Sequence, residues 1–261
     1  MSTAPAVPSA EATSPPFGAL LRAGLVGGAC AGLVGALVSL LVVEAPIRSA
    51  LAIEAAREAA ARGHADTHAH EELFSRNTQV VGGMLAAVLV GLVLGVVFAV
   101  VLAWLRPQLA GRTDYGRAVA LALGGFVAVS LLPAVKYPAN PPSVGDPDTI
   151  GTRTLYYVSF LAASIALAAV VLAVRRRLPA RWPASWTATA CTLLAVAGYA
   201  VLLLAWPASP DPIPADVPAA LIWRFRLSSL AELAALWVTL GIVAGLVLER
   251  ATTRTARPVI A

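Results

Sequence analysis

The sequence predicts an all-α, polytopic membrane protein, built as a bundle of about six transmembrane helices. Of its 261 residues, 59% are hydrophobic and only 13% are charged, whereas soluble proteins carry roughly 25% charged residues. Apolar runs are spread along the whole chain, and each is long enough to cross roughly 30 Å of hydrocarbon as a helix. Because lipid offers no hydrogen-bond partners to the backbone, each run must be helical.

The chain divides into an N-terminal tail, a single transmembrane domain and a C-terminal tail. We expect residues 1–16, which are rich in Ala, Ser and Pro, to be disordered. The transmembrane domain spans 17–250, and 251–261 form the C-terminal tail. The third helix is the weakest prediction, because it is short and Pro133 interrupts its end, so five helices are the alternative. The six expected helices cover about 17–43, 80–105, 118–135, 155–174, 186–206 and 227–248.

Glycines recur four residues apart in three of these helices. Such spacing places them on one helix face and allows close backbone approach, which drives helix association where lipid supplies no hydrophobic force. The faces could form an interface with a partner subunit, but packing inside the bundle is the interpretation we favour. The glycines are Gly24, Gly28 and Gly32, Gly91 and Gly95, and Gly241 and Gly245.

The positive charges, eighteen arginines and one lysine, gather at the ends of the apolar runs. This distribution is typical of membrane topology signals, so we expect no nucleic-acid partner. With both termini in the cytoplasm, eleven of the positive charges lie in the inner segments and eight in much longer outer loops. The density therefore favours an N-in, C-in orientation. The sequence contains no G-x-x-x-x-G-K-[ST], G-x-S-x-G, H-E-x-x-H or C-x-x-C motif, so we expect no enzyme.

The first expected outer loop, 44–79, contains all three histidines. His64, His68, His70 and Glu72 lie within nine residues, after an Ala- and Glu-rich stretch that favours helix. If the helix continued past Gly63, His64, His68 and Glu72 would share one face. Imidazole and carboxylate suit Co, Ni or Zn, so these residues form a candidate metal-capture site. The alternative is a solvated, histidine-rich loop.

Two further outer loops are rich in proline. The loop 136–154 carries the candidate transport residues, and its prolines impose a stiff, extended path. It is either a lid or filter over a transport path or a plain connector. In the loop 207–226, Arg224 and Arg226 directly precede the sixth helix, where Glu232 is a costly intramembrane acid. Glu232 either pairs with Arg224, lines a cation path or reaches headgroups. The candidate transport residues are Lys136, Tyr137, Asn140, Pro141, Pro142, Gly145 and Arg153.

Two motifs and a weaker third resemble those of the CbtA family, whose members are described as predicted cobalt transporter subunits. The first is Lys136-Tyr-Pro-x-Asn-Pro-Pro-x-x-Gly145 with Thr149, Arg153 and Thr154. The second is Pro214-Ala-Asp-x-Pro218 with Leu221-Ile-Trp223, Phe225-Arg226, Ser229 and Leu236-Trp237. The third is Arg76-x-x-Gln79 with Gly83, Gly91 and Gly95. Their order and spacing agree along nearly the whole chain after the N-terminal tail.

The resemblance implies a membrane subunit of a Co²⁺ uptake system linked to cobalamin synthesis. It also implies a partner, a small single-helix membrane subunit with a histidine-rich terminus. The family is usually described with five helices, whereas the apolar runs here indicate six.

We therefore expect a multi-pass protein of the bacterial inner (cytoplasmic) membrane that needs no cofactor and transports Co²⁺ as cargo. Co²⁺ would be captured by the histidine cluster and pass beneath the two proline-rich loops. We expect the loop cations to anchor the loops by pairing with Asp146, Asp148, Asp211 or Asp216. The rival functions are a scaffold that transports nothing and a transporter of a corrinoid-type substrate.

Overall fold

The computed structural model describes residues 15–62, 75–109, 111, 113–142 and 144–255, which form helices and their connections. Six helices in this part of the chain are long and apolar enough to cross a membrane. This confirms the prediction of six rather than five. The helices are α1 (Phe17–Val38), η1 (Ser39–Val43) and α2 (Glu44–Arg62), which are continuous; α3 (Arg76–Leu105) with η2 (Arg106–Gln108); α4 (Asp114–Gly125), η3 (Phe126–Leu131) and α5 (Leu132–Lys136), also continuous; η4 (Pro147–Thr149) and α6 (Ile150–Arg177); α7 (Ala184–Ala205); and α8 (Ala219–Thr255).

Several helices extend beyond their predicted ends. The expected outer loop is helical from residue 44 as far as Arg62, and its Ala- and Glu-rich stretch had favoured helix. Helix α8 begins at Ala219 instead of 227 and ends at Thr255. Hydropathy detects the part of a helix that lies in hydrocarbon. Helical hydrogen bonds continue into water wherever the residues favour helix, as the Ala- and Glu-rich sequence of α2 does. Counted from Phe17 to Ala60, the first membrane helix is therefore 44 residues long, about 66 Å at 1.5 Å per residue.

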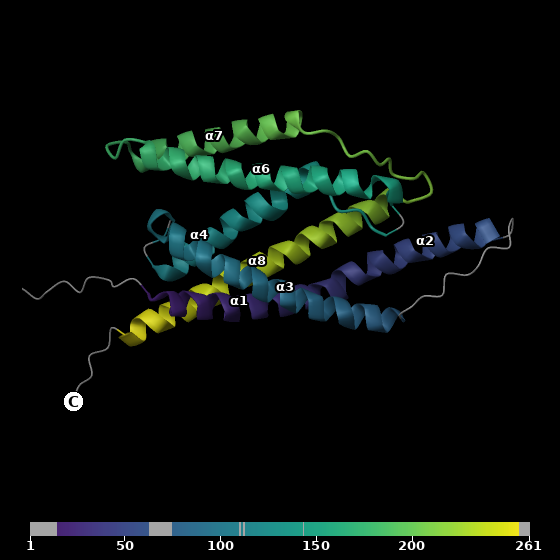
Figure 1. Ribbon diagram of the computed structural model, residues 1–261, viewed down its shortest axis with the longest axis horizontal. Coiled ribbons are helices and arrows are strands. Elements are labelled where there is room, and N and C mark those ends of the chain that lie inside the picture. The colour runs from purple at the N-terminus through teal and green to yellow at the C-terminus, as the bar shows by residue number, and fades with distance from the viewer. Residues whose placement is uncertain (1–14, 63–74, 110, 112, 143, 256–261) are drawn as a thin grey trace, which may run out of the picture.

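The α5–α6 and α7–α8 connections lie at one end of the bundle, and the start of α1 and the end of α8 lie at the other (Figure 1). We call the end that holds the far end of α2 and the connections α5–α6 and α7–α8 the loop end. The opposite end, here the terminal end, holds the start of α1, the end of α8 and the short α3–α4 and α6–α7 connections. Both ends of the described chain thus lie on one side, as an even number of crossings requires.

Glycine faces hold the centre of the bundle together. A Cβ atom added at Gly24 or Gly28 would overlap backbone atoms of α3, and one at Gly91 or Gly95 would overlap α1. A Cβ added at Gly245 would meet the ring of Tyr115 of α4. The expected packing of glycines inside the bundle is therefore confirmed, because only a residue without a side chain permits this approach.

The third membrane helix passes through Pro133 without ending. Proline lacks an N–H group and its ring crowds the carbonyl one turn earlier. Here the wider π-turn η3 directly precedes α5, which contains Pro133, and the whole segment remains helical from Asp114 to Lys136. Neighbouring helices supply hydrogen bonds at this point. Tyr199 Oη donates to the Leu132 carbonyl (2.9 Å), and Trp237 Nε1 donates to Ser130 Oγ (2.9 Å).

Candidate functional site

The candidate site at the loop end begins with Lys136, which ties α5 to the end of α7. Its Nζ donates to the carbonyls of Leu203 (2.8 Å) and Trp206 (2.7 Å). Leu203 lies in the last turn of α7, where carbonyls lack intrahelical partners and carry the negative end of the helix dipole, and Trp206 is the C-cap residue that follows. The adjacent Tyr137 Oη donates to the Pro207 carbonyl (2.7 Å). Lys136 therefore caps a helix, where an aspartate partner was among the expectations.

Arg153 and Asp211 join the two proline-rich loops. Arg153 Nε lies 2.9 Å from Asp211 Oδ2, and the Asp211 side chain is only 2% exposed. The N–H is not aligned for a hydrogen bond, so the contact is an ion pair. Thr149 Oγ1 donates to the other carboxylate oxygen of Asp211 (2.6 Å). Gly145 has φ +116°, and a Cβ there would collide with the Arg153 guanidinium. The expected pairing of a loop cation with Asp211 is confirmed.

Asn140 links the loop 136–154 to α8 through a hydrogen bond. Its Oδ1 accepts a hydrogen bond from Arg226 Nη2 (2.9 Å), and the adjacent Pro141 is fully buried. Pro142 is partly buried. The side-chain oxygen of Asn140, one of the candidate transport residues, therefore already faces a guanidinium. This geometry favours an anchoring role for Asn140 and leaves the filter interpretation to the backbone carbonyls.

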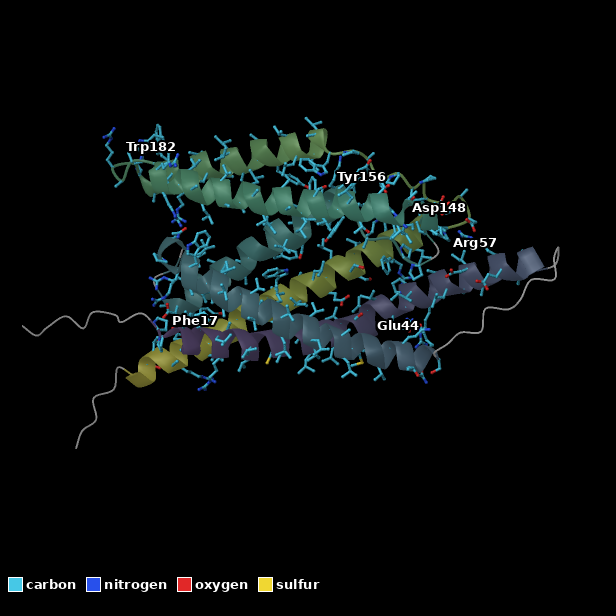
Figure 2. The ribbon with its side chains drawn as sticks, viewed as in Figure 1. Phe17, Glu44, Arg57, Asp148, Tyr156 and Trp182 are labelled. Carbon is cyan, nitrogen blue, oxygen red and sulfur yellow. The ribbon has the colours of Figure 1, made fainter. Side chains whose placement is uncertain are left out.

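The projecting helix α2 is fastened to the same loops. Arg57 Nε and Nη2 donate to the two oxygens of Asp216, at 2.6 and 2.8 Å. Hydrogen bonding from Arg57 is the main cause that lowers the pKa of Asp216. Figure 2 shows Arg57 and Asp148 at the loop end, far from Phe17 and Trp182. A small apolar cluster packs α2 against the two loops and α8. It contains Ala50 of α2, Val144, Val217, and Leu221 and Ile222 of α8. We call this whole assembly the loop clamp.

A cavity of about 230 Å³ lies beside the loop clamp, between α1, α3 and α8. Glu44 is buried in its wall, where Arg76 Nε donates to Oε1 (3.1 Å) and Arg76 Nη2 donates to Oε2. Arg48 Nε also donates to Oε1 of Glu44 (2.9 Å). Glu232 of α8 completes the charged lining. The cavity is lined by Ala36, Ser39, Leu40, Glu44, Ile47, Arg76, Gln79, Val80, Gly83, Met84, Ala87 and Glu232.

The cavity brings together one predicted site residue and several that sequence reasoning did not select. Glu232 lies thirteen residues after the start of α8 at Ala219, and no ion pair with Arg224 is found among the described residues. Glu44 and Ser39 were not predicted as site residues, because no motif in the sequence around them indicates a function. The available signal was Arg76-x-x-Gln79, part of the resemblance, since both residues line this cavity.

The predicted capture residues His64, His68, His70 and Glu72 lie outside the described residues, so the geometry of that site stays a prediction. Within the part of the chain that the structure describes, no group of three or more His, Cys, Asp or Glu side chains is arranged to hold a metal ion.

Six helices that are long and apolar enough to cross a membrane define a multi-pass membrane protein. The family described as "Probable cobalt transporter subunit (CbtA)" matches residues 17–249, which is nearly the whole chain, and the chain belongs to this family. No curated protein and no solved structure matches it. The resemblance seen in the sequence motifs is thereby confirmed.

Proposed function

We infer that the chain is a membrane subunit that takes up Co²⁺ for cobalamin synthesis, in the bacterial inner (cytoplasmic) membrane. The family match over residues 17–249 carries this proposal. The cavity near the loop end supports it, because its lining includes two carboxylates and only one of them has a cationic partner among the described residues. The proposal is one of transport and assigns no catalytic residue.

The loop end faces the outside in this proposal. Arginine density supports this orientation, because the terminal end holds Arg106, Arg117 and the run Arg175–Arg177 in or beside short connections. The loop clamp then stands at the mouth that Co²⁺ enters, at the end of the bundle where α2 ends and α3 begins. We propose that the three histidines capture the ion before it reaches the helices. Replacing all three with Ala should raise the Co²⁺ concentration for half-maximal uptake more than it lowers the maximal rate.

A small single-helix membrane subunit with a histidine-rich terminus is the proposed partner, as the resemblance implies. The rival function is a scaffold that transports nothing and only holds such a partner. The glycine faces that would have served as its interface are occupied by internal helix packing. The exposed apolar faces of α6 and α7 remain available to a partner or to lipid. Co²⁺ flux in vesicles with the purified chain, alone and with its partner, separates transport from scaffolding.

Transport of a corrinoid is the second rival. A cavity of about 230 Å³ is far too small for a corrin ring with its side chains, whereas a partly hydrated metal ion fits. An excess of cobinamide should therefore leave Co²⁺ uptake unchanged. Strong competition by cobinamide would favour the corrinoid reading.

The decisive experiment measures cobalt, nickel and zinc in cells with and without the gene, in low-metal medium. We expect the cobalt content to fall several-fold on deletion, with nickel and zinc nearly unchanged, and the chain supplied from a plasmid to restore it. Equal cobalt content in both strains would contradict the proposal. Added cobalamin should rescue growth of the deletion strain if the cobalt serves cobalamin synthesis.

The role of the loop 136–154 needs its own test. Replacing residues 139–144 with Gly and Ser removes the Asn140–Arg226 hydrogen bond and the buried Pro141, but leaves the flanking helices unchanged. We expect normal membrane insertion and loss of Co²⁺ uptake, because a flexible segment loses more entropy on ordering. Uptake at normal protein levels would show that the loop is only a connector.

A further inference from the structure

A second cavity of about 230 Å³ lies at the terminal end, between η2 with the residue after it and the last turn of α6. Leu172, Arg175 and Arg176 of α6 line it and stand at positions i, i+3 and i+4, so they share one face of the helix. The next residue, Arg177, does not line the cavity, and no acid is among the described residues that do. The cavity therefore has a basic wall on one defined face of α6.

The two arginines of this wall have hydrogen-bond donors to offer. Arg175 Nη1 donates to the Gln108 carbonyl (3.1 Å), which holds the guanidinium between α6 and η2, and the group keeps further N–H donors. Neither Arg175 nor Arg176 forms an ion pair with a described residue. Asp114, at the start of α4, is already paired with two other arginines. The positive charge of the cavity is therefore left for an anion to balance.

Gln108 adds an unpartnered acceptor to the same cavity. Its Nε2 donates to the Trp104 carbonyl (3.4 Å), but its Oε1 is buried and accepts no hydrogen bond from a described residue. Buried polar atoms in proteins nearly always have a partner. A ligand that carries a hydroxyl beside its anionic group would supply the missing donor.

Tryptophans at the terminal end indicate that the cavity lies at the level of lipid headgroups. Trp104 near the end of α3 and Trp182 and Trp186 around the start of α7 are exposed, and Figure 2 shows Trp182 at this end. Exposed tryptophans are enriched where a membrane protein meets the interface between lipid and water. The anion with the closest access to the cavity is therefore a phospholipid headgroup, and Leu172 gives its acyl chains an apolar side to follow.

We propose that this cavity binds an acidic phospholipid, with its phosphate at Arg175 and Arg176 and a headgroup hydroxyl on Gln108 Oε1. Phosphatidylglycerol has this combination of groups, and basic pockets between membrane helices suit acidic headgroups. The bound lipid would join α6 to η2, where the Arg175–Gln108 hydrogen bond already links them. It would thus stabilise the terminal end, as the loop clamp stabilises the opposite end. The site does not depend on which substrate the protein transports.

The test titrates the purified full-length chain in neutral detergent with phosphatidylglycerol, with phosphatidylcholine of the same acyl chains, and with inorganic phosphate. Thermal melting and native mass spectrometry measure binding. We expect only phosphatidylglycerol to raise the melting temperature and to stay bound. Arg176→Gln should raise its half-saturating concentration about fivefold, the effect typical of one basic residue at an anionic lipid surface. The matched control is Arg177→Gln, which removes the adjacent charge outside the cavity and should bind as wild type does.

Arg176 makes no side-chain hydrogen bond to a described residue, so its variants should melt as wild type does without lipid. Arg176→Lys keeps the charge and should retain most of the binding, which separates a lost charge from a lost fold. Equal losses in the Arg176→Gln and Arg177→Gln variants would show diffuse attraction and overturn the site, as would wild-type affinity in Arg176→Gln. Stabilisation by inorganic phosphate to the same degree would overturn a lipid as the ligand.

Discussion

The α1–α3 pair and the α6–α7 pair are both membrane helix pairs, yet different interactions hold them. Between α1 and α3 the backbones meet at glycines, and a Cβ on Gly28 would overlap the Gly91 carbonyl. On α7 no residue is fully buried. That helix is held by aromatic contacts and hydrogen bonds that reach it from other elements. Close packing of small residues and a few polar anchors are thus two separate solutions to helix association without a hydrophobic driving force.

Phe160 of α6 lies at the centre of the aromatic contacts that hold the α6–α7 pair. It is fully buried, and its ring meets Tyr137, Tyr199 and Trp206 edge-on, at centroid distances of 5.7, 6.4 and 5.8 Å. Edge-to-face contacts of this kind add stability beyond the area they bury. Trp206 Nε1 also donates to Ser159 Oγ of α6 (3.0 Å). One aromatic cluster therefore anchors the second pair at the loop end, and Gly198 of α7 packs against Leu167 of α6 farther along the pair.

The largest effect should come from a side chain added where the glycines of α1 and α3 pack against each other. We call this contact the glycine seam. Gly28→Ala places a methyl group against the α3 backbone, which cannot move aside. We expect a loss of about 2–3 kcal/mol in the free energy of unfolding, or failure to fold, from overpacking. Gly82→Ala is the control, because nothing lies within 4 Å of its added Cβ. Unfolding in detergent micelles measures both, and equal stability would disprove the glycine seam.

Truncation of the aromatic centre should have an intermediate effect. Phe160→Ala leaves a cavity among three rings, and we expect about 2 kcal/mol of destabilisation, less than in a water-soluble core because lipid removes the hydrophobic part. Tyr157→Ala on the same helix is the control, since Tyr157 is 40% exposed. Protease sensitivity of the α6–α7 pair should rise only in the Phe160 variant. An equal rise in both would show that the cluster is not the anchor.

The loop clamp should respond more to Asp211 than to Asp216. The side chain of Asp211 is 2% exposed, whereas that of Asp216 is 51% exposed. Asp211→Asn leaves Arg153 without its partner charge, and we expect a loss of about 1–2 kcal/mol. Asp216→Asn, at the solvated pair with Arg57, should change stability much less. Thermal melting of both variants tests this order. If Asp216→Asn lost more stability than Asp211→Asn, the Arg57–Asp216 pair on α2 would contribute more to the loop clamp than the Arg153–Asp211 pair.

The smallest effect is a pH dependence at the Arg57–Asp216 pair. Hydrogen bonding by Arg57 lowers the pKa of Asp216 below 3.8. A carboxylate with a lowered pKa in the folded state contributes stability above its unfolded pKa and loses it as the pH falls through the folded value. Wild-type protein should therefore lose this contribution only below about pH 3.8, and Asp216→Asn should not show that step. Melting curves across this range provide the measurement.

Local sequence properties determined which segments are helical and how many cross the bilayer. An apolar run in lipid has no alternative to helix, because every backbone group must find its partner within the run. The six crossings, the shared side of the two ends and the close-packing glycines were therefore readable in advance. The Ala- and Glu-rich sequence before Gly63 also favoured the helix that α2 forms. The ends of α8 could not be read in the same way, since hydropathy stops at the hydrocarbon boundary and helical hydrogen bonding does not.

The tertiary structure alone decided which polar groups meet. Arg76 lies 32 residues from its partner Glu44, and Arg226 lies 86 residues from Asn140. The sequence offered several acids for each loop cation and gave no reason to choose among them. Lys136 took helix-end carbonyls, while Glu232 was left beside Ser39 in a cavity. Such pairings depend on how rigid helices pack in three dimensions, and that packing is set by contacts between residues far apart in the chain.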